Sequence, residues 1–459
     1  MSREQTTRTV ETVTDDPSPS VRLSVQDRAT SPSSSHIDVL MLDAHNRQAV
    51  SCARVYGRRG LGVGLVGCEQ DAAAPVPAFA SQWCSMHAVV PDFSTHADAF
   101  VDALLALIDR YHPRMVLPGH DGSIEAMRSR RAELERVTAL PLAAERALEV
   151  TVSKARTLSV ARSLGIAVPR NRHVGDMKDA ADAIADIGMP AVIKPFRSWV
   201  NNSGVGAHLT SEPVTTVDGT HRALERVLSQ GSHALLQEWL PGRRDAVSIF
   251  YAQDRVWARF AQTSYREFPA LGGVSVLCES LPLLDDIVQP AEALVREIGM
   301  EGCSMVEFRR DAQGRPVLME INPRIGGSVA LAVRSGVNFP NMLYDWATGQ
   351  PLTEVKTYRT GRRLRWLAGD IWNLKATFNY QGLPDVPRGG QAVATFFLDF
   401  IRRPSALDPI HVRDMRPAFV ELHRTLVIPY QEKLKRTRLK RRAARAARAQ
   451  HAGKVVTTR

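Results

Sequence analysis

The sequence contains no apolar run long enough to cross a membrane. A spanning helix needs about 18 or more consecutive apolar residues, and charged or polar residues interrupt every stretch of that length. The polar N-terminus also lacks the apolar centre of a secretory signal peptide. These absences argue against a membrane-spanning helix and predict a cytoplasmic location.

Cysteine is scarce and scattered. The five cysteines form no CxxC pair and no even framework, so neither structural zinc nor disulfides are indicated. They are Cys52, Cys68, Cys84, Cys278 and Cys303. The chain also lacks the Ser or Cys elbow of enzymes that use a covalent side-chain nucleophile. No internal repeat is present.

Acidic residues are almost absent from the C-terminal end. Residues 431–459 contain eleven Lys and Arg and one acid, so they carry +10 of the total net charge of +11. A helix there would have arginines on every side, with no apolar stripe to insert into a membrane and no aromatic residues to stack on bases. A solvated basic tail is the default interpretation, and contact with a polyanion through its phosphates is the alternative.

The remaining chain has the composition of a globular protein with two or three domains: 459 residues in all, 44% hydrophobic and 23% charged. Residues 1–35 are rich in Ser, Thr, Asp and Pro, which predicts a disordered leader. Residues 36–148 alternate strand and helix patterns, which predicts an open parallel α/β domain. Asp43, His120 and Asp121 follow predicted strands, where turn formation and helix capping are favoured over ligand binding.

The pattern changes near residue 150. A helix over 152–165, a helix over 177–187 and a buried strand at 191–196 are followed mostly by strands, which predicts an antiparallel sheet with helices on one face. We expect a C-terminal extension over 351–430 and a basic tail over 431–459.

The stretch from Met305 to Ser328 carries the strongest chemical signal. Two apolar strands flank a turn, and a two-residue Gln313–Gly314 loop puts Glu307 directly opposite Glu320, with Asn322 on the same face. Opposed carboxylates repel each other. A divalent cation bound between them would replace this repulsion with attraction to both groups. Two carboxylates and an amide oxygen suit Mg²⁺ that also holds nucleotide phosphates, with Mn²⁺ as an alternative.

A phosphate-binding element precedes this hairpin. Lys194 ends a buried strand and could neutralise phosphates, and the small-residue loop with Ser203, Gly204 and Gly206 could cradle them with its amides. Lys154 lies forty residues upstream of Lys194. Taken singly, the loop sequence predicts an ordinary hairpin turn, and Lys154 is expected to be a solvent-exposed charge on a helix.

In order and spacing, these residues resemble the ATP-grasp superfamily of carboxylate-amine ligases, the group that includes carbamoyl phosphate synthetase. The resemblance implies an N-terminal open parallel α/β domain, the pre-ATP-grasp domain, followed by a two-lobed α+β ATP-grasp domain. The small lobe is expected over 149–235 and the large lobe over 236–350. It assigns the adenine to the segment with Glu238 and Leu240, and the ribose to Asp245. Arg324, which follows Asn322, is assigned to a phosphate.

The resemblance further implies an ADP-forming ligase. ATP would phosphorylate a small-molecule carboxylate, and an amine would displace the phosphate to give an amide or peptide bond. Arg259 and Arg266 could bind a substrate carboxylate, although surface charge is the favoured interpretation of both. The alternatives are an ATP-binding protein without chemistry and a polyanion-binding protein that acts through the tail. A homodimer is a further hypothesis, and the sequence does not identify the acid or the amine.

Overall fold

The computed structural model describes residues 36–69, 74–196, 211–269, 273–379 and 386–427, with the backbone alone of 22–24, 199–202 and 205–208. The basic tail 431–459 and most of the predicted leader 1–35 lie outside these residues. Within the described part of the chain, no helix is both long and apolar enough to cross a lipid bilayer.

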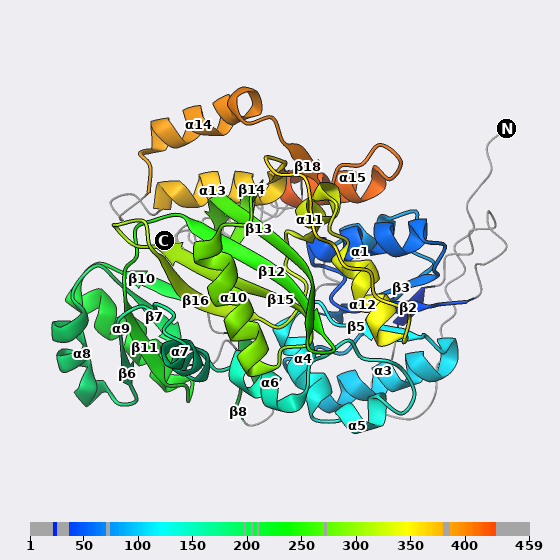
Figure 1. Ribbon diagram of the computed structural model, residues 1–459, viewed down its shortest axis with the longest axis horizontal. Helices are drawn as coiled ribbons and strands as arrows, with labels where there is room; N and C mark the ends of the chain where they lie inside the picture. The colour runs from blue at the N-terminus through cyan, green and yellow to red at the C-terminus, as the bar shows by residue number, and fades with distance from the viewer. Residues whose placement is uncertain are drawn as a thin grey trace, which may run out of the picture.

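The N-terminal domain is built on an open sheet with the strand order β1-β4-β3-β2-β5 (Figure 1). Four strands run parallel, as predicted, and β1, which lies within the predicted leader, pairs antiparallel with β4. The strands are β1 (Arg22–Ser24), β2 (Val39–Met41), β3 (Val63–Cys68), β4 (Met86–Val90) and β5 (Met115–Leu117). The helices are α1 (Arg47–Arg58), α3 (Ala97–Tyr111), α4 (Asp121–Arg128), α5 (Arg131–Leu134) and α6 (Glu145–Thr151), with a short 3-10 turn, η1 (Pro77–Ala80). β4 was not predicted, because its short sequence MHAVV interrupts the apolar pattern with a histidine.

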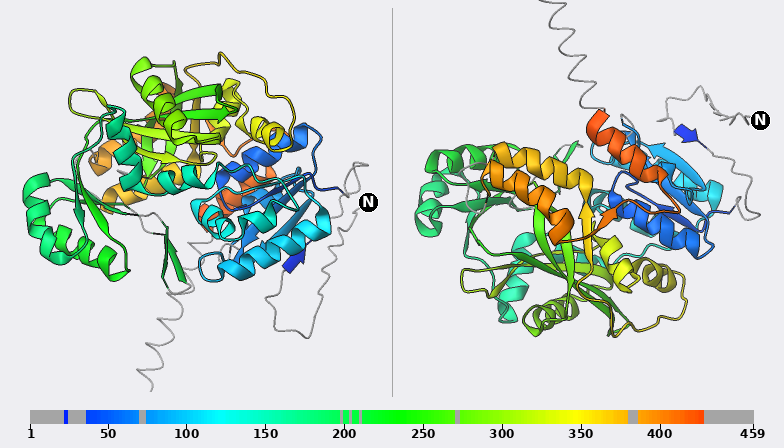
Figure 2. Two further views of the ribbon diagram at one scale, coloured as in Figure 1. Left: turned by 60° about the horizontal axis from the view of Figure 1, so that its bottom comes forward. Right: turned by 90° about the horizontal axis from the view of Figure 1, so that it is seen from above.

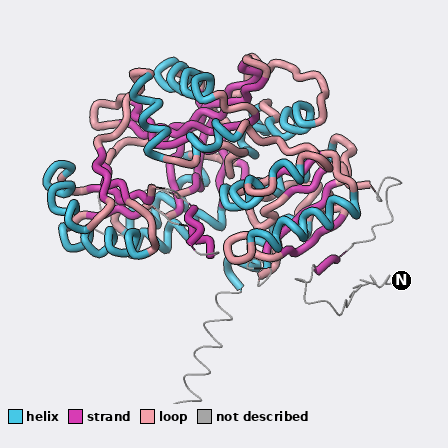
Figure 3. Tube along the Cα trace, turned by 90° about the horizontal axis from the view of Figure 1, so that it is seen from below, coloured by secondary structure: helices cyan, strands magenta, loops and turns pink. Residues whose placement is uncertain are grey.

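The small lobe follows helix α7 (Lys154–Ser163) and has its own antiparallel sheet, in the order β10-β7-β11-β6. Its elements are β6 (Asn171–Val174), η2 (Met177–Asp179), α8 (Ala180–Ile187), β7 (Ala191–Pro195), β10 (Glu212–Val214), α9 (Val217–Ser229) and β11 (Ala234–Glu238). A separate hairpin, β8 (Trp199–Asn202) and β9 (Val205–His208), leaves the lobe between β7 and β10. The described strands form distinct groups with helices around them (Figure 3).

The large lobe is a seven-stranded sheet in the order β16-β15-β12-β13-β14-β17-β18. Its strands are β12 (Arg244–Ala252), β13 (Arg255–Phe268), β14 (Val274–Leu281), β15 (Gly302–Arg310), β16 (Pro316–Asn322), β17 (Arg363–Trp366) and β18 (Ala406–Asp408). All neighbours are antiparallel except β17 and β18. Residues 351–430, predicted as an extension, therefore contribute two strands to this sheet.

Helices surround the large-lobe sheet. They are α10 (Asp285–Ile298), α11 (Val329–Ser335), α12 (Phe339–Ala347), α13 (Leu367–Asn379), α14 (Gly389–Arg402) and α15 (Arg416–Leu422), which continues into the short π-helix η3 (His423–Val427). Helices α13, α14 and α15 lie on one side of the molecule, toward the viewer when it is seen from above (Figure 2).

Three buried clusters show how the parts are joined. Two of them combine residues of the N-terminal domain and the large lobe, such as Phe100 with Phe308 and Tyr56 with Phe260. The third contains small-lobe residues alone, including Ile193 and Leu236. The N-terminal domain and the large lobe thus share their cores, whereas the small lobe packs around its own. All five cysteines are buried.

Candidate active site

Two carboxylates face each other across the β15–β16 hairpin. Glu307 lies directly opposite Glu320, as the sequence predicts, and Asn322 lies two residues further on the same face. The Asn322 amide donates to Glu307 at 3.3 Å and to Glu320 at 3.5 Å. The three predicted metal ligands therefore lie together.

The turn of this hairpin differs from the predicted two-residue loop. The last pair of the ladder joins Arg310 to Pro316, so the turn covers residues 311–315. The Asp311 carboxylate holds this wider turn by accepting from the backbone N–H of Gln313 at 2.9 Å and of Arg315 at 2.8 Å. The wider turn shifts the pairing of the strands by one residue, and a β-bulge next to the glutamates shifts it back. Glu307 therefore still lies opposite Glu320, as predicted, although the predicted turn was wrong.

The two glutamates differ in their electrostatic surroundings. Burial raises the pKa of Glu307, although the Arg244 guanidinium 3.1 Å away opposes this. Burial acts in the same direction on Glu320, but Lys154, Lys194 and Arg244 together outweigh it and lower its pKa. The site therefore gathers several buried charges of both signs, an arrangement that is costly unless each charge is compensated.

The two predicted lysines border this acid pair. Lys194, on β7, is buried, and burial lowers its pKa to about 8; Glu320 acts in the opposite direction and Lys154 adds to the fall. Lys154, also buried, is the first residue of α7, the helix that packs against β16. Two buried lysines in one site favour an anionic ligand, because its negative charge would compensate theirs.

A cavity of about 110 Å³ lies where the small lobe meets the large one. Lys194, both glutamates and the segment that links the lobes line it. Its lining residues are Val192, Lys194, Ser211, Gln237, Glu238, Trp239, Leu240, Arg244, Glu267, Glu307, Arg309, Met319 and Glu320. The Glu238 carboxylate accepts from the Arg170 backbone N–H at 2.8 Å and from its guanidinium at 2.9 Å.

The donor set fits a hard divalent cation such as Mg²⁺. In the described part of the chain, no three His, Cys, Asp or Glu side chains gather as a metal site. The ligands here would be two carboxylates, the Asn322 amide oxygen and oxygens from a nucleotide. This matches the oxygen chemistry that Mg²⁺ takes at phosphate sites.

Arg324 connects this site to the N-terminal domain. Its guanidinium donates to both carboxylate oxygens of Asp121, at 2.9 and 3.2 Å. His120 caps α4 by accepting from the Gly122 N–H, and Asp43 accepts from the Gly119 N–H, so both act as turn and capping residues, as favoured from the sequence. Asp121 does more, because its carboxylate sets the direction of Arg324.

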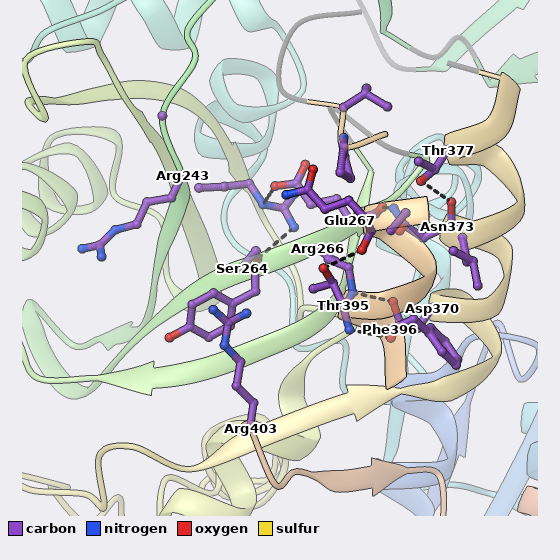
Figure 4. Close-up of a pocket in the computed structure, with 18 of the residues that line it drawn as sticks. Arg243, Ser264, Arg266, Glu267, Asp370, Asn373, Thr377, Thr395, Phe396 and Arg403 are labelled. Atoms are coloured by element: carbon purple, nitrogen blue, oxygen red, sulfur yellow. Dashed lines mark hydrogen bonds and ion pairs between the residues drawn. The ribbon is translucent and has the colours of Figure 1, made fainter. Parts of the chain in front are cut away.

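A second, larger cavity of about 460 Å³ adjoins the first, between β12–β13 and helices α13 and α14 (Figure 4). Both cavities are lined by Arg244, Glu267 and Arg309. Glu267 accepts from Arg244 at 3.2 Å and from Arg309 at 3.1 Å, which places an ion-paired group at the junction. Five arginines and two acids line the larger cavity, so its lining is net positive; they are Arg243, Arg244, Arg266, Arg309, Arg403, Glu267 and Asp370.

The two arginines considered for a substrate carboxylate are both held by acids. Arg266 donates to the two Asp370 oxygens at 2.7 Å each and also pairs with Asp399, tying β13 to α13 and α14. Arg259 pairs with Glu292 of α10 and lines neither cavity. Arg266 is thus a largely buried structural residue rather than the surface charge favoured from the sequence.

Comparison with known proteins identifies the domain that carries this site. Residues 232–369 match the sequence model of a family described as ATP-grasp in the biosynthetic pathway with Ter operon. This stretch includes the linking segment and the three oxygen ligands on β15 and β16. The chain contains an ATP-grasp domain.

Curated proteins are similar to a little under half of this chain. The chain is 28% identical over 219 residues to the carbamoyl phosphate synthase large chain of Thermus thermophilus, covering 45% of this chain and 20% of that protein. It is 24% identical over 236 residues to the formate-dependent phosphoribosylglycinamide formyltransferase of Ignicoccus hospitalis, covering 49% and 56%. The chain therefore spans only about a fifth to a half of the length of these relatives.

Solved structures show the same fold at low sequence identity. Biotin carboxylase from Campylobacter jejuni superposes with a TM-score of 0.57 at 14% identity, over 72% of this chain and 74% of that one. An L-amino acid ligase from Bacillus licheniformis gives a TM-score of 0.52 at 17% identity, over 72% and 78%. The predicted fold, an α/β domain followed by an ATP-grasp domain, is confirmed.

Asp245 is the exception among the residues that the ATP-grasp resemblance assigned. It lies on the opposite face of the sheet from Glu307, because it pairs with Phe308 while Ala246 pairs with Glu307. There it is fully buried and held by Arg310 at 2.8 Å, so it cannot reach a ribose in the cavity. The prediction counted residues from the linking segment and ignored the two-residue period of the strand.

Sequence reasoning missed Arg244, which faces the cavity in place of Asp245. The same two-residue period, counted back from Ala246, would have found it. Glu267 and Arg309 carried no motif and are recognised only because the strands bring them together. Ser203 and Gly204 lie outside the described residues, and Gly206 lies on β9 opposite Asn201.

Proposed function

We propose that this protein is an ATP-dependent ligase that activates a carboxylate as an acyl phosphate and joins it to an amine, releasing ADP and phosphate. One observation carries the proposal. The opposed pair Glu307 and Glu320 lies in one buried site with Lys154 and Lys194, beside a cavity at the junction of the lobes. Such a site suits a nucleoside triphosphate with its metal ion, because the opposed acids can hold the ion and the buried lysines can face the phosphates.

The nucleotide would enter the smaller cavity. Lys154 and Lys194 neutralise its phosphates, and the loop with Ser203, Gly204 and Gly206 covers them with backbone amides. The adenine lies against the linking segment at Leu240. Glu238 ties the start of that segment to Arg170, which directly precedes β6 of the small lobe.

Glu307, Glu320 and Asn322 would hold the metal ion, with Mg²⁺ as the expected ion and Mn²⁺ as an alternative. When bound, the ion would neutralise part of the negative charge of the nucleotide phosphates. Arg244 opposes the rise in the pKa of Glu307 that burial causes, and its ion pairs with Glu307 and Glu267 fix the Glu307 carboxylate in place. The protein's task is positioning and charge compensation.

In the reaction, a carboxylate oxygen of the substrate attacks the γ-phosphorus and the bond to the ADP oxygen breaks. The amine nitrogen then attacks the acyl carbon, loses a proton, and phosphate leaves. Arg324, held by Asp121, is directed to stabilise the charge on the transferred phosphoryl oxygens. Lys194 acts on the same oxygens from the small lobe.

The larger cavity is the place we assign to the acceptor substrates. It shares Arg244, Glu267 and Arg309 with the nucleotide cavity, and its five arginines, although each is also paired with an acid, suit an anionic acceptor such as a small carboxylate or an amino acid. Its other walls carry apolar side chains of α13 and α14, such as Leu374 and Phe396. Mixed linings of this kind are typical of small-molecule sites.

The decisive experiment is a screen for ADP release from ATP and Mg²⁺ with pools of amino acids and small carboxylates. Pairs of substrates that stimulate release, and a product of matching mass, would support the ligase. Glu320→Gln is the matched control and should release no ADP. ATP binding without release from any pool would favour an ATP-binding protein without chemistry. A homodimer and a cytoplasmic location stay predictions.

A further inference from the structure

Helix α14 exposes its apolar residues to solvent and turns its acid inward. Phe397 is 62% exposed and Ile401 79% exposed, with Phe400 beside them. Asp399 is buried instead, in an ion pair with Arg266. A surface helix ordinarily shows the reverse pattern, with polar residues outward.

The last described helices repeat this pattern. On α15 and η3, Phe419 is 63% exposed, and Leu422 and Leu426 are also exposed. The acid of this segment, Glu421, accepts a hydrogen bond from the Trp366 indole N–H at 2.9 Å. The two segments lie on the same side of the molecule (Figures 1 and 2).

The charges around these apolar side chains have one sign. Among described residues 386–427, no acidic side chain is exposed; Asp399, Asp408 and Asp414 are buried, and Glu421 is partly covered. The exposed charged residues there are Arg388, Arg402, Arg413 and Arg416. We call the exposed apolar residues of α14, α15 and η3, together with these four arginines, the apolar-basic face.

The chain continues from this face into its most basic segment. Residues 431–459 begin four residues after the end of η3 and contain eleven Lys and Arg and one acid. Their positive charge adds to that of the four arginines on the face. Any partner must therefore accept both large apolar side chains and a high density of positive charge.

We propose that the apolar-basic face docks on the surface of a membrane that contains anionic phospholipids. Phenylalanine, leucine and isoleucine side chains would enter the boundary between headgroups and acyl chains, and the arginines and basic tail would contact the negative headgroups. A second copy of the chain fits less well, because pairing two such faces brings their arginines and tails together. Nucleic acid would match the charge but would leave the apolar side chains in water.

This inference does not depend on the proposed ligase activity, since Phe397, Ile401 and Phe419 line neither cavity. The test is flotation of the full chain with vesicles of phosphatidylcholine alone or with roughly one third phosphatidylserine. Phe397→Ser combined with Ile401→Ser removes apolar contacts. Val137→Ser combined with Val217→Ser is the control, at residues that are 55% and 50% exposed on other parts of the surface.

The full chain should float with the phosphatidylserine vesicles and not with phosphatidylcholine alone. The α14 double variant should bind at least about tenfold more weakly, because each side chain of that size contributes on that order when it leaves water. The control should bind as the unchanged protein does. Deletion of residues 431–459 and added salt should each weaken binding as well, since both reduce attraction to the headgroups.

Several results would overturn the proposal. One is the absence of flotation with phosphatidylserine vesicles. Another is equal binding by the α14 double variant, with RNA competing for the protein, which would assign the attraction to the tail and to polyanions in general. A loss of dimers in light scattering with unchanged flotation would assign the face to a second copy. If the double variant melts at a lower temperature, Phe419→Ser on α15 provides the same comparison.

Discussion

Replacing Lys194 with Met should stabilise the nucleotide-free protein at neutral pH while weakening ATP binding. Burial lowers the pKa of Lys194 from 10.5 to about 8. One pKa unit corresponds to about 1.36 kcal/mol, so holding the charged form in the folded protein costs roughly 3 kcal/mol at pH 7. Methionine keeps a flexible apolar stem without the charge, so up to that amount should be recovered as free energy of unfolding.

The stability gained by the substitution should depend on pH. Between about pH 8 and 10.5 the unfolded chain holds a proton on Lys194 that the folded protein has released, so the stability of the unchanged protein rises with pH in that window. The advantage of the variant should therefore be largest below pH 8 and shrink toward pH 10. ATP affinity should fall by about 1.5–3 kcal/mol, the range for a hydrogen bond to a charged group.

Urea unfolding between pH 7 and 10 and calorimetric titration with ATP measure the two effects. Lys356→Met is the control, because Lys356 is an exposed lysine outside the cavities and should change neither quantity. A variant at Lys194 that is less stable at pH 7, or whose stability difference does not change with pH, would refute the account of a buried charged lysine. Unchanged ATP affinity would remove Lys194 from the phosphate site.

Three further predictions follow from the same geometry. Glu320→Gln should abolish ADP release with an unchanged melting temperature, and release at the normal rate would refute the metal assignment. Asp245→Asn should cost about 3–5 kcal/mol in urea unfolding, because it leaves Arg310 without its buried partner, but ATP affinity should stay within a factor of about two; weakened ATP binding in a stable protein would restore the ribose role. Arg266→Met should destabilise the protein by a similar amount through Asp370 and Asp399, and normal stability with weakened acceptor binding would show instead that it contacts substrate.

Local sequence patterns predicted the parts of the site that lie within one hairpin or one strand. Glu307 and Glu320 face each other because residues directly opposite in an antiparallel pair share a face, and this period of two is readable from the residues alone. The length of the turn could not be predicted, because it depends on hydrogen bonds to the Asp311 side chain. A β-bulge then restores the register that the longer turn would have shifted. Asp245 was misassigned because it was chosen by its distance along the chain from the linking segment, without asking which face of the strand it is on.

Contacts between distant segments could not be predicted in the same way. The pairing of Arg324 with Asp121 joins residues 203 positions apart, and the Glu267 pair with Arg309 joins β13 to β15. Nothing in either segment signals its partner, because such pairs depend on how separate elements pack. The larger cavity is of this kind, since segments far apart in the sequence, strands β12 and β13 and helices α13 and α14, form its walls.

The sequence by itself determined the open parallel domain, the ATP-grasp signature and the excess of positive charge at the C-terminal end, because each depends on composition or on short-range periodicity. Only the tertiary structure decided which acid each cavity arginine pairs with, and which face of α14 meets solvent. Those outcomes depend on burial and on partners from other elements. Charge compensation in a protein is a property of neighbours in space rather than in sequence.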